Sequence, residues 1–144
     1  MILNSQFKFM EAEMLAKVKS AGVFGVDGYV IDVEVDISNG LPVFDIVGLP
    51  DTSVRESKER VRASIKNSGF EFPIKRITVN MAPADTKKEG SAFDLAIAVG
   101  ILMATQQIPQ YENFDPIYLG ELSLDGTLRP IKGVLPMLLS VQKQ

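Results

Sequence analysis

The stretch YVIDVEVDI, residues 29–37, decides how this chain is built. Five apolar side chains recur at every second position and three acids stand between them: Tyr29, Ile31, Val33, Val35 and Ile37 alternate with Asp32, Glu34 and Asp36. A period of two with β-branched residues predicts a strand with one buried face and one face in water. The rest of the chain must then supply the layer that covers the buried face.

The residues on either side of this strand predict a small sheet. Asn39-Gly40 provides the left-handed pair that a tight two-residue turn requires, which predicts a hairpin into a second strand at 42–47. That second strand is apolar on both faces apart from Asp45, a pattern typical of a central strand. A weaker apolar pattern at 15–23 predicts another strand alongside.

Helical spacing replaces this pattern after residue 50. A helix is predicted to begin near Ser53, which forms a capping-box spacing with Glu56, and to end at Gly69. Its buried stripe is expected to combine apolar residues with serines at helical intervals: Val54, Ser57, Val61, Ser64, Ile65 and Ser68.

The second half of the chain alternates strands and helices. A strand is predicted at 76–81, and a helix at 91–104 is apolar nearly all round, so it should be the buried central helix. Ser91 and Asp94 have capping-box spacing at its start. Two strands, 117–124 and 127–131, and a last helix from Gly133 follow. The order β, β, β, α, β, α, β, β, α predicts an α+β domain, a mixed β-sheet packed with three helices.

Composition excludes several classes of function. The chain has 144 residues, 46% hydrophobic and 23% charged, which fits one globular domain. It has no cysteine and no histidine, so it lacks disulfides, thiolate nucleophiles and imidazole bases. With a net charge of −3, any binding of nucleic acid must come from a local patch. No apolar run is long enough to span a bilayer, so we expect no membrane contact and a cytoplasmic location.

The two ends of the chain differ from the domain between them. Residues 1–13 show neither a signal-peptide pattern nor a period that joins the following strand, so we expect a leader outside the fold. The domain is expected over 14–144, and because no cap or breaker precedes Gln144, we expect a C-terminally truncated domain.

The sequence contains no nucleotide-binding motif. No G-x-x-x-x-G-K-[ST] occurs, and no G-x-G-x-x-G follows a strand. One loop could carry chemistry, because Ser91 at a helix start could act as a nucleophile. A serine needs a base, however, and without histidine only a lysine or a carboxylate could serve. The competing interpretation is that Ser91 only caps the helix.

Five motifs carry a resemblance to a known family. They are ISNGLPVFDIVGLPD (37–51), VRESKERVRA (54–63), ITVNMAPAD (77–85), KEGSAFDL (88–95) and LGELSLDG (119–126). Together they resemble the N-terminal domain of the Mg-chelatase-like AAA+ ATPases, the YifB/ComM family. The resemblance implies the fold of Lon protease proteolytic domains, also described as ribosomal protein S5 domain 2-like. It also implies an ATPase module outside this chain that binds ATP and Mg²⁺ and assembles as a homo-hexamer. ComM members are implicated in branch migration of DNA during natural transformation.

The likeness to Lon implies where a catalytic dyad of serine and lysine would stand. Aligned on the KEG at 88–90, the serine position falls on Ala92. Aligned on the PIKG at 130–133, the lysine position falls on Met137. We therefore predict no catalytic residue, cofactor or metal in this chain. The first hypothesis is a non-catalytic accessory domain that contacts its own ATPase module, DNA or a protein partner.

Two alternatives stay open at this point. One is a Lon-like serine peptidase with a displaced dyad of Ser91 and Lys132. The other, weaker, is a component of a magnesium chelatase, although nothing in the sequence supplies porphyrin ligands.

A basic stripe is the candidate interaction surface. On a helical wheel for 51–68, four cations fall within about 80° of each other, beside the apolar face: Arg55, Lys58, Arg62 and Lys66. The functional interpretation is a contact for phosphates or for an acidic partner. The competing interpretation is a solvated helix face with an Arg55–Glu59 pair.

Overall fold

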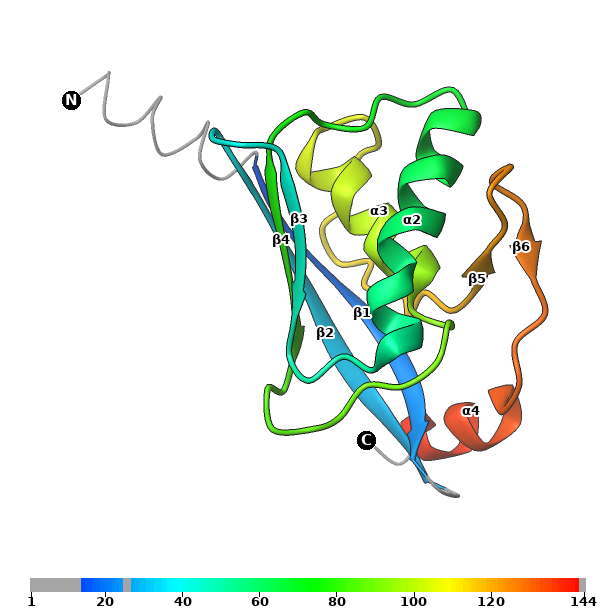
Figure 1. Cartoon of the computed structure of the whole chain (residues 1–144). Helices are drawn as coiled ribbons and strands as arrows, with labels where there is room; N and C mark the ends of the chain where they lie inside the picture. The colour runs from blue at the N-terminus through cyan, green and yellow to red at the C-terminus, as the bar shows by residue number, and fades with distance from the viewer. Residues whose placement is uncertain (1–13, 25–26, 143–144) are drawn as a thin grey trace.

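The computed structural model describes residues 14–24 and 27–142, and it shows a sheet covered on one face by helices (Figure 1). The expected leader at 1–13 lies outside the described residues, as do residues 25–26 and 143–144. The elements follow the predicted order: β1 (Leu15–Phe24), β2 (Asp27–Ser38), β3 (Val43–Val47), α2 (Thr52–Asn67), β4 (Arg76–Ala82), α3 (Asp94–Ala104), β5 (Glu121–Leu122), β6 (Leu128–Arg129) and α4 (Val134–Gln142). The predicted α+β class, with a mixed sheet and three helices, is confirmed.

The sheet has the order β1-β2-β4-β3. β2 pairs antiparallel with β1 and with β4, whereas β3 pairs parallel with β4. The predicted hairpin at Asn39-Gly40 is therefore wrong, because β4 lies between the two strands that the turn was expected to join. The register explains the preference: β4 sets Ile77, Val79 and Met81 opposite the apolar residues of β2.

The prediction of a central position for residues 42–47 is also wrong. β3 is an edge strand, and only Phe44 among its residues is buried. Its second apolar face is exposed, since Val43 and Val47 keep 42% and 45% of their surface in contact with solvent. The apolar pattern on both faces thus reflects exposed valines rather than burial on two sides.

The core lies between the sheet and the two long helices. The residues of β2 that were expected to face inward, Ile31, Val33, Val35 and Ile37, are buried. α3 packs on β1 and β2 and is buried along most of its length, as predicted. Close packing depends on Gly100, where an added Cβ would lie 2.7 Å from the Val35 Cγ2 atom.

The helix starts differ from the predicted capping boxes. α2 is capped by Asp51, whose carboxylate accepts a hydrogen bond from the Val54 amide at 2.7 Å, so the Ser53–Glu56 box is wrong. The predicted end at Gly69 is confirmed by its φ of +86°. Ser68, expected in the buried stripe, is instead the exposed C-cap. α3 begins at Asp94 without a side-chain cap, so the Ser91–Asp94 box is wrong as well.

The segment after α3 is mostly irregular. The strands predicted at 117–124 and 127–131 shrink to the two-residue pair β5 and β6. Gly126 supports their tight turn with a φ of +92°, as Asp125-Gly126 predicted. α4 then returns to pack against the β1–β2 hairpin. None of the described helices is long and apolar enough to cross a membrane.

Candidate functional site

The basic stripe, Arg55, Lys58, Arg62 and Lys66, lies along one side of α2 as the helical wheel predicted. Arg55 and Lys66 are exposed, and Lys58 and Arg62 are half-buried. The expected Arg55–Glu59 pair does not form. Arg55 instead donates to the Pro50 carbonyl at 3.1 Å, and Glu59 pairs with Arg62 at 3.1 Å. Among the described residues, neither Lys58 nor Lys66 has a carboxylate partner, so two ammonium groups of the stripe are uncompensated.

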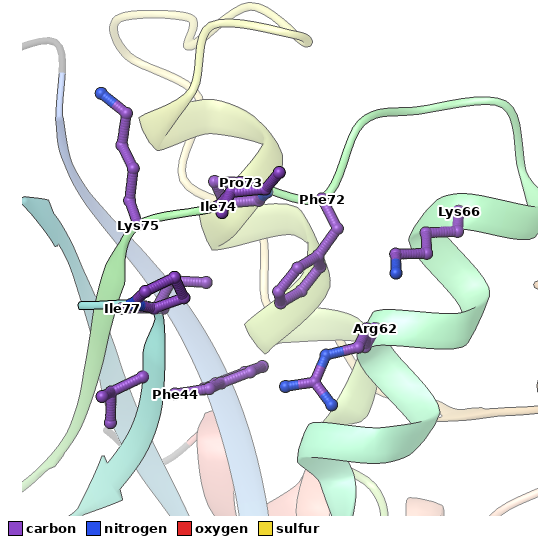
Figure 2. Close-up of a pocket in the computed structure, with 10 residues that line it drawn as sticks. Phe44, Arg62, Lys66, Phe72, Pro73, Ile74, Lys75 and Ile77 are labelled. Atoms are coloured by element: carbon purple, nitrogen blue, oxygen red, sulfur yellow. The ribbon is translucent and has the colours of Figure 1, made fainter. Parts of the chain in front are cut away.

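One end of the stripe borders a surface cavity of about 270 Å³ (Figure 2). Arg62 and Lys66 reach it from α2. Lys75 also lines it, but its ammonium points away from the two rings (Figure 2) and donates to Asn39 Oδ1 at 3.2 Å. Its floor is aromatic, with the rings of Phe44 and Phe72 5.7 Å apart between centroids. The Arg62 guanidinium carbon lies 5.3 Å from the Phe72 centroid, a cation–π contact that holds the side chain at the rim. Two cations therefore point into the cavity, and none of the residues that line it is a carboxylate.

A second cavity, of about 330 Å³, brings together the residues named by the Lon comparison. Ser91, Ala92, Lys132 and Met137 all line it, although 45 residues separate the two most distant in sequence. Ala92 contributes a methyl group and Met137 a thioether, neither of which is a nucleophile or a base. Within the described residues, Ser91 Oγ and Lys132 Nζ make no hydrogen bond to each other.

Sequence reasoning missed a buried ion pair behind this cavity. The Asp94 carboxylate is fully buried and accepts hydrogen bonds from Ser57 Oγ at 2.5 Å, Arg60 Nε at 2.6 Å and the Leu122 amide at 3.0 Å. Hydrogen bonding to Asp94 raises the pKa of Arg60. The pair joins α2, α3 and β5. A single acid inside the apolar helix 91–104 was the signal that could have revealed it, because a buried carboxylate requires a cation or several donors.

Lys88 is a second buried charge that the sequence did not reveal. Its ammonium donates to the carbonyls of Gly48 and Pro83, and burial lowers its pKa from the ordinary value. Backbone bonds run beside it, from the Lys88 amide to the Leu49 carbonyl at 3.0 Å and from the Asp51 amide to the Lys88 carbonyl at 2.9 Å. Lys88 thus fixes the loop that leads to Ser91 against the turn that starts α2.

The described part of the chain contains no group of three or more histidine, cysteine, aspartate or glutamate residues that could hold a metal ion. The cations of the stripe and the apolar residues of the first cavity can bind anions and apolar groups.

Comparison with known proteins places the chain in a class and then in a family. Residues 33–144 match the model of the family described as subunit ChlI of Mg-chelatase. The chain belongs to this Mg-chelatase-like family and, within it, to the YifB/ComM group. It is 46% identical over 129 residues to the competence protein ComM of Haemophilus influenzae, an overlap of 90% of this chain and 25% of that protein.

Two further relatives show a similar level of identity. The chain is 49% identical over 122 residues to YifB of Salmonella typhimurium and 46% identical over 121 residues to YifB of Escherichia coli. Each alignment covers 84% of this chain and 24% of the relative. The chain therefore spans about a quarter of the length of these relatives.

Proposed function

We propose that this chain is the non-catalytic interaction domain of an ATP-dependent AAA+ protein that acts on DNA in the cytoplasm, in branch migration during natural transformation. ATP and Mg²⁺ would bind in an ATPase module outside this chain, and the whole protein would work as a homo-hexamer. The name of one relative, a competence protein, supports this assignment. So does the absence of a phosphate-binding loop from the sequence. We also propose the Lon-like fold, which the resemblance implies and with which the observed α+β class is consistent.

One observation carries the proposed interaction surface. Four cations lie on one side of α2, and Lys58 and Lys66 have no ion-pair partner among the described residues, although the whole chain has a net charge of −3. The chain has 18 acidic residues against 15 basic ones. Two lysines left without an ion pair in an acidic protein favour a negatively charged partner.

The test places a double charge reversal in the full-length family protein that carries this domain. Lys58→Glu with Lys66→Glu should reduce branch migration of DNA at least tenfold and leave ATP hydrolysis measured without DNA unchanged. The matched control, Lys87→Glu with Lys132→Glu, changes the net charge equally away from α2. Branch migration at the wild-type rate in the α2 variant would refute the proposed surface. Separately, the 144-residue chain should bind Mg-ATP no more tightly than about 100 μM, some −5.5 kcal/mol, in calorimetry.

A serine peptidase with a displaced dyad is the second candidate. One observation favours it, namely that Ser91 and Lys132 line the same cavity. The positions that the Lon comparison assigns to catalysis, Ala92 and Met137, line it too and are chemically inert. We therefore expect casein to survive prolonged incubation with the chain. Proteolysis by the wild-type chain that disappears in Ser91→Ala would establish the peptidase instead, whereas equal background proteolysis in both would not.

A further inference from the structure

β3 presents an open edge. In the described part of the chain its only backbone pairing is with β4, so the opposite side of Val43–Val47 carries unpaired N–H and C=O groups. Such an edge is a template for an added strand, and proteins usually protect it with lysine, proline or a bulge. Residues 43–47 contain neither lysine nor proline, and Asp45 is their one charged residue. Leu41, just before the strand, is 83% exposed.

The basic stripe forms the wall beside this open edge. α2 follows β3 through a short turn and runs back along it (Figure 1). The far side of α2 faces α3, where Ser57 and Arg60 bind Asp94. The stripe lies on the other side, since Arg62 and Lys66 share the cavity of Figure 2 with residues 42–44. At the opposite end, Arg55 reaches the Pro50 carbonyl just beyond β3.

The strand and the stripe match in length and spacing. β3 extends for about 13 Å at the usual rise of a strand, and the eleven steps from Arg55 to Lys66 cover about 16 Å at the rise of a helix. Acids at every second position of an added strand would be about 6.7 Å apart. The cations of the stripe follow one another at three or four residues, about 4.5 to 6 Å. Each acid of such a strand would therefore meet one cation of the stripe.

We propose that the groove between β3 and α2 binds an extended acidic peptide, which adds to the sheet as a fifth strand next to β3. This inference rests on the proposed interaction surface and names its partner. The two faces of the added strand have different requirements. Toward α2 the stripe selects acids. On the open face of the sheet, Val43 and Val47 flank the exposed Asp45, which selects apolar residues and repels acids. The peptide should therefore alternate acidic and aliphatic residues.

The aromatic floor favours a peptide over a nucleic acid. Bases need a free aromatic face for stacking. Phe44 is 7% exposed, and the half-buried Phe72 already contacts both the Phe44 ring and the Arg62 guanidinium, so the floor offers less aromatic surface than two free rings would. The exposed side chain at the rim is instead aliphatic, with Ile74 83% exposed beside Lys75. Aliphatic contacts combined with an unpaired strand edge are features of peptide recognition.

The probe is a fluorescein-labelled peptide of nine alternating valine and glutamate residues, titrated with the 144-residue chain by fluorescence anisotropy. We expect saturable binding that weakens at least about tenfold in Lys58→Glu/Lys66→Glu, since each reversal replaces an attraction with a repulsion. The control variant Lys87→Glu/Lys132→Glu should bind within about twofold of wild type, because these residues lie outside the groove. Circular dichroism would verify that both variants are folded.

Two modified peptides test strand addition itself. In a strand, the amides of alternate residues point to opposite sides, so only the valine amides or only the glutamate amides can face β3. N-methylation of one set should abolish binding, and methylation of the other set should leave it intact. A block peptide with the same composition but segregated residues should bind at least tenfold more weakly. Equal binding of the two methylated peptides, or of the block peptide, would overturn the proposal.

The outcomes separate this inference from the proposed function. If a labelled single-stranded oligonucleotide binds through the stripe and the alternating peptide does not bind, the proposed peptide ligand is refuted and the proposed interaction surface stands. The same conclusion follows if Lys58→Glu/Lys66→Glu abolishes branch migration in the full-length protein while the wild-type chain fails to bind the peptide. If the double reversal affects neither branch migration nor any ligand, both proposals fall.

Discussion

Replacement of Asp94 tests the buried ion pair most directly. Its carboxylate has no exposure to solvent, and Asp94→Ala removes the acceptor of Ser57, Arg60 and Leu122 together. Removing one partner of a buried pair costs about 3–5 kcal/mol. Arg60 keeps a hydrogen bond to the Ser53 carbonyl at 2.8 Å, and its side chain is 20% exposed, so part of its charge stays solvated. We therefore expect Asp94→Ala to lower the free energy of unfolding by about 3 kcal/mol, toward the lower end of that range.

The measurement is urea unfolding followed by circular dichroism, with a double-mutant cycle as the control. Asp94→Ala, Arg60→Ala and the double variant should show strong coupling, because the second substitution removes the charge that the first leaves unpaired. Arg60→Ala should cost at least as much as Asp94→Ala, since it leaves a wholly buried carboxylate. A cost below about 1 kcal/mol for Asp94→Ala, or additive costs in the cycle, would refute this account.

Three further predictions use other features of the structure. Lys88→Met should change the pH dependence of stability, because burial lowers the folded-state pKa of Lys88 and the unfolded chain holds more protons between that value and 10.5. The stability of wild type relative to the variant should therefore rise with pH in this window. A stability difference that stays constant from pH 7 to 10 would contradict this. Gly48→Ala should destabilise more than Gly69→Ala. Both glycines have positive φ, but an added Cβ at Gly48 would lie 2.2 Å from the Met81 carbonyl oxygen, whereas Gly69 has open space. We expect losses of about 1 kcal/mol for Gly69→Ala and at least about 3 kcal/mol for Gly48→Ala in thermal melts, and equal shifts of the melting temperature would count against the clash. Duplex DNA should bind the 144-residue chain only weakly at low salt, and each phosphate contact removed by Arg55→Glu and Arg62→Glu should reduce the slope of log K against log salt by about 0.9; an unchanged slope would place the contacts elsewhere.

The element order was predictable because the periods of the sequence are strong. The alternation in 29–37 and 76–81 and the helical spacing between 53 and 68 all correspond to elements of the structure. The pairing of the strands was not predictable in the same way. Asn39-Gly40 reports local turn chemistry, whereas the neighbour of β2 is decided by β4, some forty residues away, whose apolar face fits the register.

The buried charges were missed for a related reason. Ser91 and Asp94 have capping-box spacing, a local pattern that occurs by chance. The true partners of Asp94 lie on α2 and β5, so only the tertiary structure identifies them. From the sequence, Lys88 is similarly indistinguishable from an exposed loop lysine. It is buried because its ammonium binds the carbonyls of Gly48 and Pro83, two residues that are far apart in sequence. The basic stripe was predictable because a helical wheel needs no tertiary information, although its Arg55–Glu59 pair was not formed.

The wrong hairpin has the largest consequence for function. If β3 were the central strand that the sequence predicted, neighbouring strands would pair with both of its sides, and the stripe would border no open edge. Because β4 is inserted between them, β3 moves to the edge, and the helix that follows it places four cations beside unpaired backbone groups. The stripe alone is an ordinary solvated helix face, and the edge alone is a risk of aggregation. Together they specify a ligand that satisfies both the backbone groups and the charges, which a duplex of DNA cannot do because it offers phosphates without a strand of amides.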